Sequence, residues 1–160
     1  IAHLPLMIAA PDLEGGRQID ALVQPPDILP TLLDLVGAEV EPPEPFHGRS
    51  FAPLLRGQSD GPFRELAVSG AFIRPANEGT IGPRHTTPVV YTKRWAYAPI
   101  GAEGDRELFD LARDPYAETN VAADHADVAD ELHRRFLDWL ADLNAPPEVV
   151  GVFKFPISNF

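Results

Sequence analysis

Residues 124–143, DHADVADELHRRFLDWLADL, decide the fold of the C-terminal part of this chain. Apolar side chains recur here every three or four positions, which is the spacing of one face of an α-helix. Charged side chains take the opposite face. The pattern predicts an amphipathic helix over residues 124–143 that is capped by Asp124 and ends before Pro146 and Pro147. Its apolar stripe consists of Val128, Leu132, Phe136, Trp139, Leu140 and Leu143.

The segments that precede this helix have the composition of short antiparallel strands. Residues 66–73 and 107–111 predict one strand each, and residues 89–92 and 95–98 predict a hairpin. We expect the helix to pack across the resulting small sheet, and the apolar tail at residues 149–160 to dock on a neighbouring surface. This part of the chain therefore has the pattern of an α+β fold.

The first third of the chain has a different pattern. The apolar run at residues 4–10 predicts a strand that is buried on both faces within a mostly parallel sheet. Residues 27–36 predict a helix with Asp27 as its N-cap. Because this helix has little polar surface, we expect it to be largely buried.

A boundary follows these elements. Ser50 is expected to cap a short helix over residues 52–56, and the stretch QSDGP at residues 58–62 has the composition of a linker. We place one domain at residues 1–60 and a subdomain at residues 61–160.

The composition excludes several classes of protein. The 160 residues include no cysteine, which excludes disulfides, thiolate metal sites and cysteine nucleophiles. The net charge of -11, from 13 basic and 24 acidic residues, argues against nucleic acid as a partner. No apolar run approaches the ~20 residues of a membrane-spanning helix, so we expect no membrane partner.

Three residues are candidates for substrate binding: His47, Arg84 and His85. His47 opens the stretch His-Gly-Arg-Ser, in which an imidazole and a guanidinium could together bind an anionic ester. Arg84 and His85 lie in a polar loop before a strand, and such loops often reach a site. A structural interpretation stays open. In it, Gly48 takes a strained dihedral in a turn, and the loop that contains Arg84 and His85 is only a connection between elements. No serine-hydrolase, phosphate-loop or zinc motif occurs, so the residues alone predict no catalytic residue and no metal ligand.

Four segments, read in order, resemble the C-terminal third of the formylglycine-dependent sulfatases of the alkaline phosphatase superfamily. They agree with that family in order and spacing, and together they extend over nearly the whole chain. They are HLPLMIAAP at residues 3–11, PDILPTLLDLVG at 26–37, HGRSFAPLLRG at 47–57 and ELFDLARDPYAETNV at 107–121.

The resemblance implies that residues 1–60 form the edge of an α/β sulfatase-type domain, and that residues 61–160 form a small antiparallel sheet with one long helix. The full-length protein would be an enzyme that hydrolyses sulfate esters. The region seen here would be structural and would shape the substrate cleft through residues 74–87. Calcium and formylglycine would belong to an N-terminal catalytic domain, since none of the family's catalytic or metal residues falls on a position of this chain. We therefore expect the chain alone to be inactive and to hold no cofactor.

Two alternatives stay open. A phosphonate or phosphate ester hydrolase of the same superfamily would share these motifs. A free-standing oligomerisation or binding module without catalysis would also retain them. The partners that we expect are the N-terminal catalytic domain, a sulfate-ester substrate and, in a homo-oligomer, a second copy of the chain. Members of the family are often exported or periplasmic, and the sequence leaves the compartment of this protein open.

Overall fold

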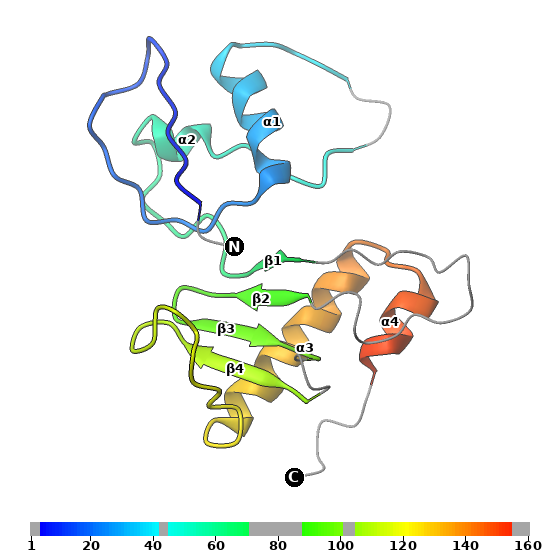
Figure 1. Cartoon of the computed structure of the whole chain (residues 1–160). Helices are drawn as coiled ribbons and strands as arrows, with labels where there is room; N and C mark the ends of the chain where they lie inside the picture. The colour runs from blue at the N-terminus through cyan, green and yellow to red at the C-terminus, as the bar shows by residue number, and fades with distance from the viewer. Residues whose placement is uncertain (1–3, 42–44, 71–87, 101–104, 155–160) are drawn as a thin grey trace. The chain divides into compact units, whose positions relative to one another are not determined.

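The computed structural model describes residues 4–41, 45–70, 88–100 and 105–154. They form two compact units, Ile1–Ala67 and Val68–Phe160 (Figure 1). The sequence places the boundary at residues 58–62, and the structure divides the chain a few residues later.

Unit 2 contains a four-stranded sheet with the order β1-β2-β3-β4. The strands are β1 Ala67–Ser69, β2 Val89–Tyr91, β3 Trp95–Ala98 and β4 Glu107–Asp110. Strands β2 and β3 pair antiparallel, as do β3 and β4, so the predicted hairpin and the predicted last strand are confirmed. The register aligns Val90, Tyr97 and Leu108 in one row, and all three are fully buried.

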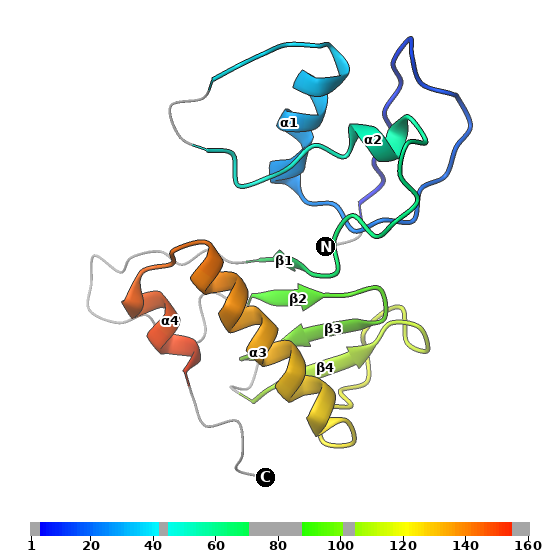
Figure 2. The same ribbon diagram turned by 180° about the vertical axis from the view of Figure 1, so that it is seen from behind.

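Helix α3, Ala126–Asp142, lies across one face of the sheet (Figures 1 and 2). The helix is confirmed, but its predicted cap is wrong because His125 and not Asp124 occupies the N-cap, without a side-chain bond. Its buried positions are Ala129, Leu132, His133, Phe136 and Leu140. No helix among the described residues is both long and apolar enough to span a membrane.

A second helix, α4 Pro147–Phe153, occupies part of the predicted apolar tail. Phe153 is buried and packs edge-to-face on Phe136, with ring centroids 5.1 Å apart. The expectation that the tail docks is therefore confirmed for Phe153. The rest of that tail, residues 155–160, lies outside the described residues.

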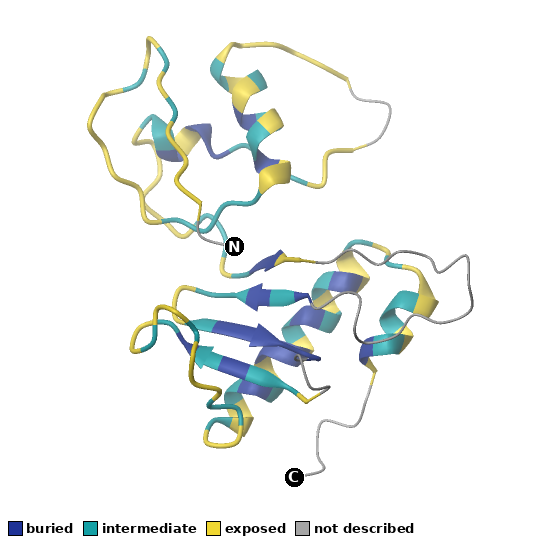
Figure 3. Ribbon diagram, in the orientation of Figure 1, coloured by how far each residue is buried: buried dark blue, intermediate teal, exposed yellow. Residues whose placement is uncertain are grey.

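Unit 1 contains two helices, α1 Pro25–Leu35 and α2 Ala52–Leu55. The strand expected at residues 4–10 is wrong: the segment is irregular and mostly exposed (Figure 3). A strand needs hydrogen-bonded neighbours, and none of the strands in the described part of the chain pairs with this segment.

The burial expected for α1 is also wrong. Its buried side chains are the polar Asp27 and Thr31, whereas Leu29, Leu32 and Val36 are 52%, 45% and 75% exposed. The large apolar side chains that are exposed in this unit are Leu4, Leu6, Met7, Ile19, Leu29, Leu32, Val36, Val40 and Phe46. We call these exposed side chains together the apolar side of unit 1.

Candidate functional site

The buried carboxylate of Asp27 is the centre of unit 1. Its Oδ1 accepts a hydrogen bond from the backbone N–H of Arg49 at 3.0 Å, and its Oδ2 accepts one from Gln24 at 2.8 Å. The guanidinium of Arg64 binds both oxygens, with Nε 3.0 Å from Oδ2. Asp27 therefore stands at the third position of α1 in a capping box with Gln24, which corrects its predicted place at the N-cap.

The electrostatics of Asp27 fit this arrangement. Burial alone would raise the pKa of the carboxyl group. The bond from Arg64 and the two backbone N–H donors outweigh burial, so the pKa of Asp27 lies below its ordinary value. The charged form is the one that holds the helix, the loop after it and Arg64 together.

Thr31 extends the same joint by one helical turn. Its hydroxyl donates to the carbonyl of Asp27 at 2.6 Å and accepts the backbone N–H of Phe51 at 3.0 Å. Both Thr31 and Phe51 are buried, so α1 and the start of α2 are joined by a satisfied polar contact inside the unit.

Gly48 is required by a close approach to α1. A Cβ added at this position would lie 2.0 Å from the carbonyl oxygen of Pro26, nearer than any side chain can come. That carbonyl has no helical donor, because the residue four positions later is Pro30, which carries no N–H. Since the φ of Gly48 lies outside the left-handed region, the strained dihedral expected from the sequence is not the reason for the glycine.

Ser50 and Arg56 fasten α2 to the end of α1. The Ser50 hydroxyl donates to Asp34 at 2.7 Å and accepts the N–H of Ala52 at 3.1 Å. Ser50 thus binds the start of α2, but Phe51 occupies the N-cap, so the predicted position of Ser50 as the cap is wrong. Arg56 binds the other oxygen of Asp34 at 2.8 Å and Asp12 at 3.1 Å. The bonds from Ser50 and Arg56 hold the pKa of Asp34 below its ordinary value.

One of the three candidate binding residues, His47, lies among the described residues. His47 is exposed. The guanidinium of Arg49, which could have assisted it, lies 4.5 Å above the ring of Phe63. Arg84 and His85, with the whole of loop 74–87, lie outside the described residues. The stretch His-Gly-Arg-Ser thus packs against α1, and its prediction as a site is supported by no contact of His47.

The last of the four motifs, at residues 107–121, also holds two segments together, here in unit 2. The side chain of Asn120 accepts the N–H of Leu108 at 3.0 Å and donates to the carbonyl of Arg106 at 3.2 Å. The N–H of Val121 then donates to the carbonyl of Leu108 at 2.8 Å. Asp114 closes the intervening turn by accepting the N–H groups of residues 118 and 119.

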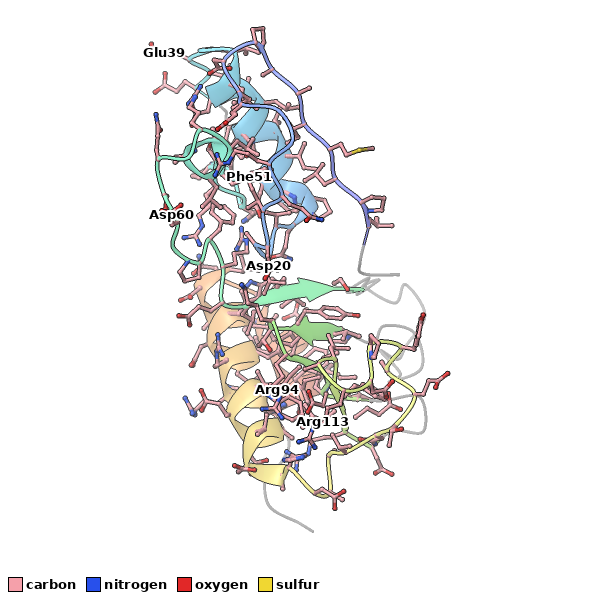
Figure 4. The ribbon with its side chains drawn as sticks, turned by 90° about the vertical axis from the view of Figure 1, so that its left-hand side faces the viewer. Asp20, Glu39, Phe51, Asp60, Arg94 and Arg113 are labelled. Carbon is pink, nitrogen blue, oxygen red and sulfur yellow. The ribbon has the colours of Figure 1, made fainter. Side chains whose placement is uncertain are left out.

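Asp110, at the end of β4, binds two exposed arginines. Arg94 donates two hydrogen bonds to its carboxylate, of 3.1 and 2.8 Å, and the guanidinium of Arg113 lies 3.8 Å away. Figure 4 labels both arginines. The bonds from Arg94 hold the pKa of Asp110 below its ordinary value. The charge of Asp110 therefore ties the end of β4 to Arg94 in the β2–β3 turn.

The described residues do not fit a metal centre. Nowhere among residues 4–41, 45–70, 88–100 and 105–154 do three or more His, Asp or Glu side chains form a group that could hold an ion. The sequence missed Asp27 and Thr31 as the centre of unit 1. The sequence did contain a signal for this arrangement. Asp27 follows Gln24 by three positions, which is the spacing of a capping box with glutamine instead of Ser or Thr at the N-cap, and Thr31 follows one helical turn later.

Comparison with known protein families identifies the family to which this chain belongs. The family described as "N-sulphoglucosamine sulphohydrolase, C-terminal" matches residues 2–142. The chain is a sulfatase C-terminal domain. Three of its four motifs, at residues 26–37, 47–57 and 107–121, supply the contacts described above. The family resemblance inferred from the sequence is confirmed.

Individual relatives agree with this assignment. Arylsulfatase K from Xenopus laevis is 29% identical over 138 residues, which cover 84% of this chain and 25% of that protein. An endo-4-O-sulfatase from Bacteroides thetaiotaomicron is 26% identical over 90% of this chain and 30% of its own length. The structure of a phosphonate monoester hydrolase from Silicibacter pomeroyi superposes with a TM-score of 0.65 and 28% identity, over 84% of this chain and 28% of that one. The chain therefore spans about a quarter of the curated relatives that it matches.

Proposed function

We propose that this sulfatase domain serves as the non-catalytic C-terminal region of a sulfuric ester hydrolase, where it stabilises the catalytic part and borders the substrate cleft. The catalytic part would carry the formylglycine and calcium that the resemblance implies. The observation that carries the proposal is the exposed apolar side of unit 1. Large apolar side chains left in solvent in such number are typical of a surface that another protein part covers.

The polar contacts of unit 1 support a structural role. Asp27, Asp34 and Arg56 are all bonded within the unit. A nucleophile, a base or a metal ligand has to face a substrate, whereas each of these groups is bonded to another group of unit 1. We infer that these groups stabilise the fold of the domain and take no part in catalysis.

Activity of the isolated chain tests the non-catalytic role. The purified 160-residue chain should hydrolyse 4-nitrophenyl sulfate no faster than buffer does, and the full-length protein should hydrolyse it readily. Hydrolysis that follows the purified chain and disappears in His47→Ala or His85→Ala would overturn the proposal.

Substrate kinetics of the full-length protein test the role at the cleft. Arg84→Ala and His85→Ala should raise KM, or shift substrate preference, by about tenfold or more, since loss of one positioning contact costs about 1–3 kcal/mol. His47→Ala should do the same if the exposed imidazole reaches substrate. Unchanged kinetics on every accepted substrate would make these residues plain loop.

A second candidate reaction is phosphonate monoester hydrolysis, which the likeness to the Silicibacter pomeroyi structure favours. The ratio of kcat/KM on an aryl sulfate to kcat/KM on a phenyl phosphonate monoester decides between the two. A ratio above one supports the sulfatase, and a ratio below one supports the phosphonate hydrolase.

The apolar side of unit 1 also bears on partners. If the catalytic part covers it, the chain made alone should associate into oligomers through this side, which light scattering measures. A strictly monomeric chain would favour the free-standing module.

A further inference from the structure

His133 is the buried imidazole that joins three elements of unit 2. It lies on α3 and is fully buried. Its Nδ1 lies 3.0 Å from the hydroxyl of Tyr97 on β3, and its Nε2 lies 2.9 Å from the carbonyl oxygen of Phe153, the last residue of α4. One side chain thus connects α3, the sheet and α4.

The partners fix the position of the ring proton. A carbonyl oxygen only accepts hydrogen bonds, so Nε2 must carry the hydrogen that binds Phe153. In the neutral ring Nδ1 then accepts, and the Tyr97 hydroxyl donates to it. The guanidinium of Arg106 in turn donates to the Tyr97 oxygen. All donors in this chain point the same way, from Arg106 through Tyr97 and His133 to Phe153.

Of the charged groups near the ring, Arg106 disfavours a second proton on His133 and Asp130 favours one. Arg106, before β4, is positive and forms an ion pair with Asp130 of α3. From β3 the ring faces the neutral Tyr97, whose pKa burial raises. From α4 it faces the Phe153 carbonyl, while Glu148 and Lys154, at the ends of that helix, are exposed. A proton on Nδ1 would turn the Tyr97 hydroxyl away from its acceptor and place a second cation near Arg106.

We propose that His133 is a pH-sensitive latch that holds α4 against α3 while its ring is neutral and releases α4 when the ring takes up a proton. The charged ring keeps its Nε2–H donor toward Phe153 but loses the acceptor that Nδ1 offers to Tyr97. Release of α4 follows because the closed state buries the charge, whereas the opened ring carries it into water. The short α4 is the element able to leave: it has seven residues, whereas α3 has seventeen and packs across the sheet.

The direction of the pH dependence follows from the burial of the ring. Burial lowers the pKa of His133 below its ordinary value, a shift that the Phe153 carbonyl only partly offsets. The open state therefore binds the proton more tightly than the closed state. The stability of the closed state is fully present above about pH 6.5, the ordinary pKa of histidine, and falls as the pH drops toward the lower pKa of the folded protein.

Nuclear magnetic resonance of the imidazole tests the closed state in the unmodified protein. At about pH 7 the ¹⁵N shifts of His133 should show a neutral ring with its hydrogen on Nε2. A charged ring, or a hydrogen on Nδ1, would overturn the proposal, and this measurement needs no variant to fold.

Hydrogen exchange with mass spectrometry on the intact protein tests the release. Between about pH 7 and about pH 5.5, exchange of the α4 amides, corrected for the intrinsic rate, should accelerate by up to about tenfold per pH unit, the limit for one linked proton. The amides of α3 should stay protected. Equal corrected protection of α4 at both values would overturn the latch.

Two variants locate the proton. In His133→Gln the side-chain amide can still accept from Tyr97 and donate to Phe153, so α4 should stay docked and lose its pH dependence. His125→Gln, at the start of the same helix, is the matched control and should keep the pH dependence of the parent. Release in His133→Gln that follows pH as in the parent would assign the effect to another group and overturn the proposal.

Discussion

The two units hold their helices in opposite ways. In unit 2 the centre of the apolar stripe of α3 is buried, with Leu132, Phe136 and Leu140 only 3%, 1% and 5% exposed. In unit 1 the buried side chains of α1 are polar, whereas Leu29 and Leu32 face solvent. The comparison teaches that an apolar stripe predicts a helix in both units, but it predicts burial only where the chain itself supplies the covering surface.

The largest effect that separates the units is expected from Asp27→Ala. Removing one partner of a buried ion pair typically costs about 3–5 kcal/mol, because the other charge is left without compensation. Hydrogen exchange should show unit 1 opened while α3 keeps its protection. Asp12→Ala, which removes the half-exposed partner of Arg56, is the control and should change stability by about 1 kcal/mol or less. Loss of protection in both units would mean that they fold as one.

Phe136→Ala should act on the other unit with a comparable but slightly smaller effect. Truncating a buried phenylalanine costs about 3–5 kcal/mol, and the loss should appear in the denaturation of unit 2, with α4 released because Phe153 packs on this ring. Trp139→Ala is the matched control, because that ring stacks on Phe136 but is only half-buried, so its effect should be smaller. An equal or larger effect of Trp139→Ala would contradict this account of the core.

Gly48→Ala should destabilise unit 1 by about 1–3 kcal/mol, the usual effect of forcing an extra methyl group into a packed site. The methyl group would collide with the carbonyl of Pro26, so α1 and its following loop must separate. Gly15→Ala, where an added Cβ meets nothing within 4 Å, is the control. A Gly48→Ala protein that melts with its parent in a thermal scan would remove the close approach as the reason for the glycine.

The smallest effect is expected on the apolar side of α1. In a dissociated chain Leu29→Ser should change stability by about 0.5 kcal/mol or less, as surface substitutions do. It should nevertheless reduce the association measured by light scattering, and it should lower the stability of the full-length protein. A large loss in the dissociated chain would show that Leu29 is already covered within unit 1.

The sequence predicted the fold of unit 2 well because its signals are local. The β2–β3 hairpin, β4 and α3 were recognised from alternation and from the helical stripe. Helix α4 was missed, because Pro146 and Pro147 were interpreted as the end of a helix, although proline also favours the first position of a new one. Asp124 was wrong as a cap because α3 begins after His125.

In unit 1 the sequence located α1 but not its environment. The run at residues 4–10 is apolar enough for a central strand, and no pattern within the chain can report whether neighbouring strands are present. The site was predicted least well. Asp27 and Gly48 were noticed as a cap and a turn residue, whereas their actual roles depend on Arg64 and Pro26, one of them 37 positions away in the sequence.

The Asn120 side chain has a consequence for which changes of length the chain tolerates. Strand β4 is at the end of the sheet, and the amide of Asn120 meets its backbone as another strand would. The surface loop from Ala112 to Thr119 must therefore have a fixed length, so that Asn120 reaches the backbone of β4. Surface loops generally accept insertions. This one should not: a single residue added after Asp114 would shift the amide out of line and leave the N–H of Leu108 unpaired.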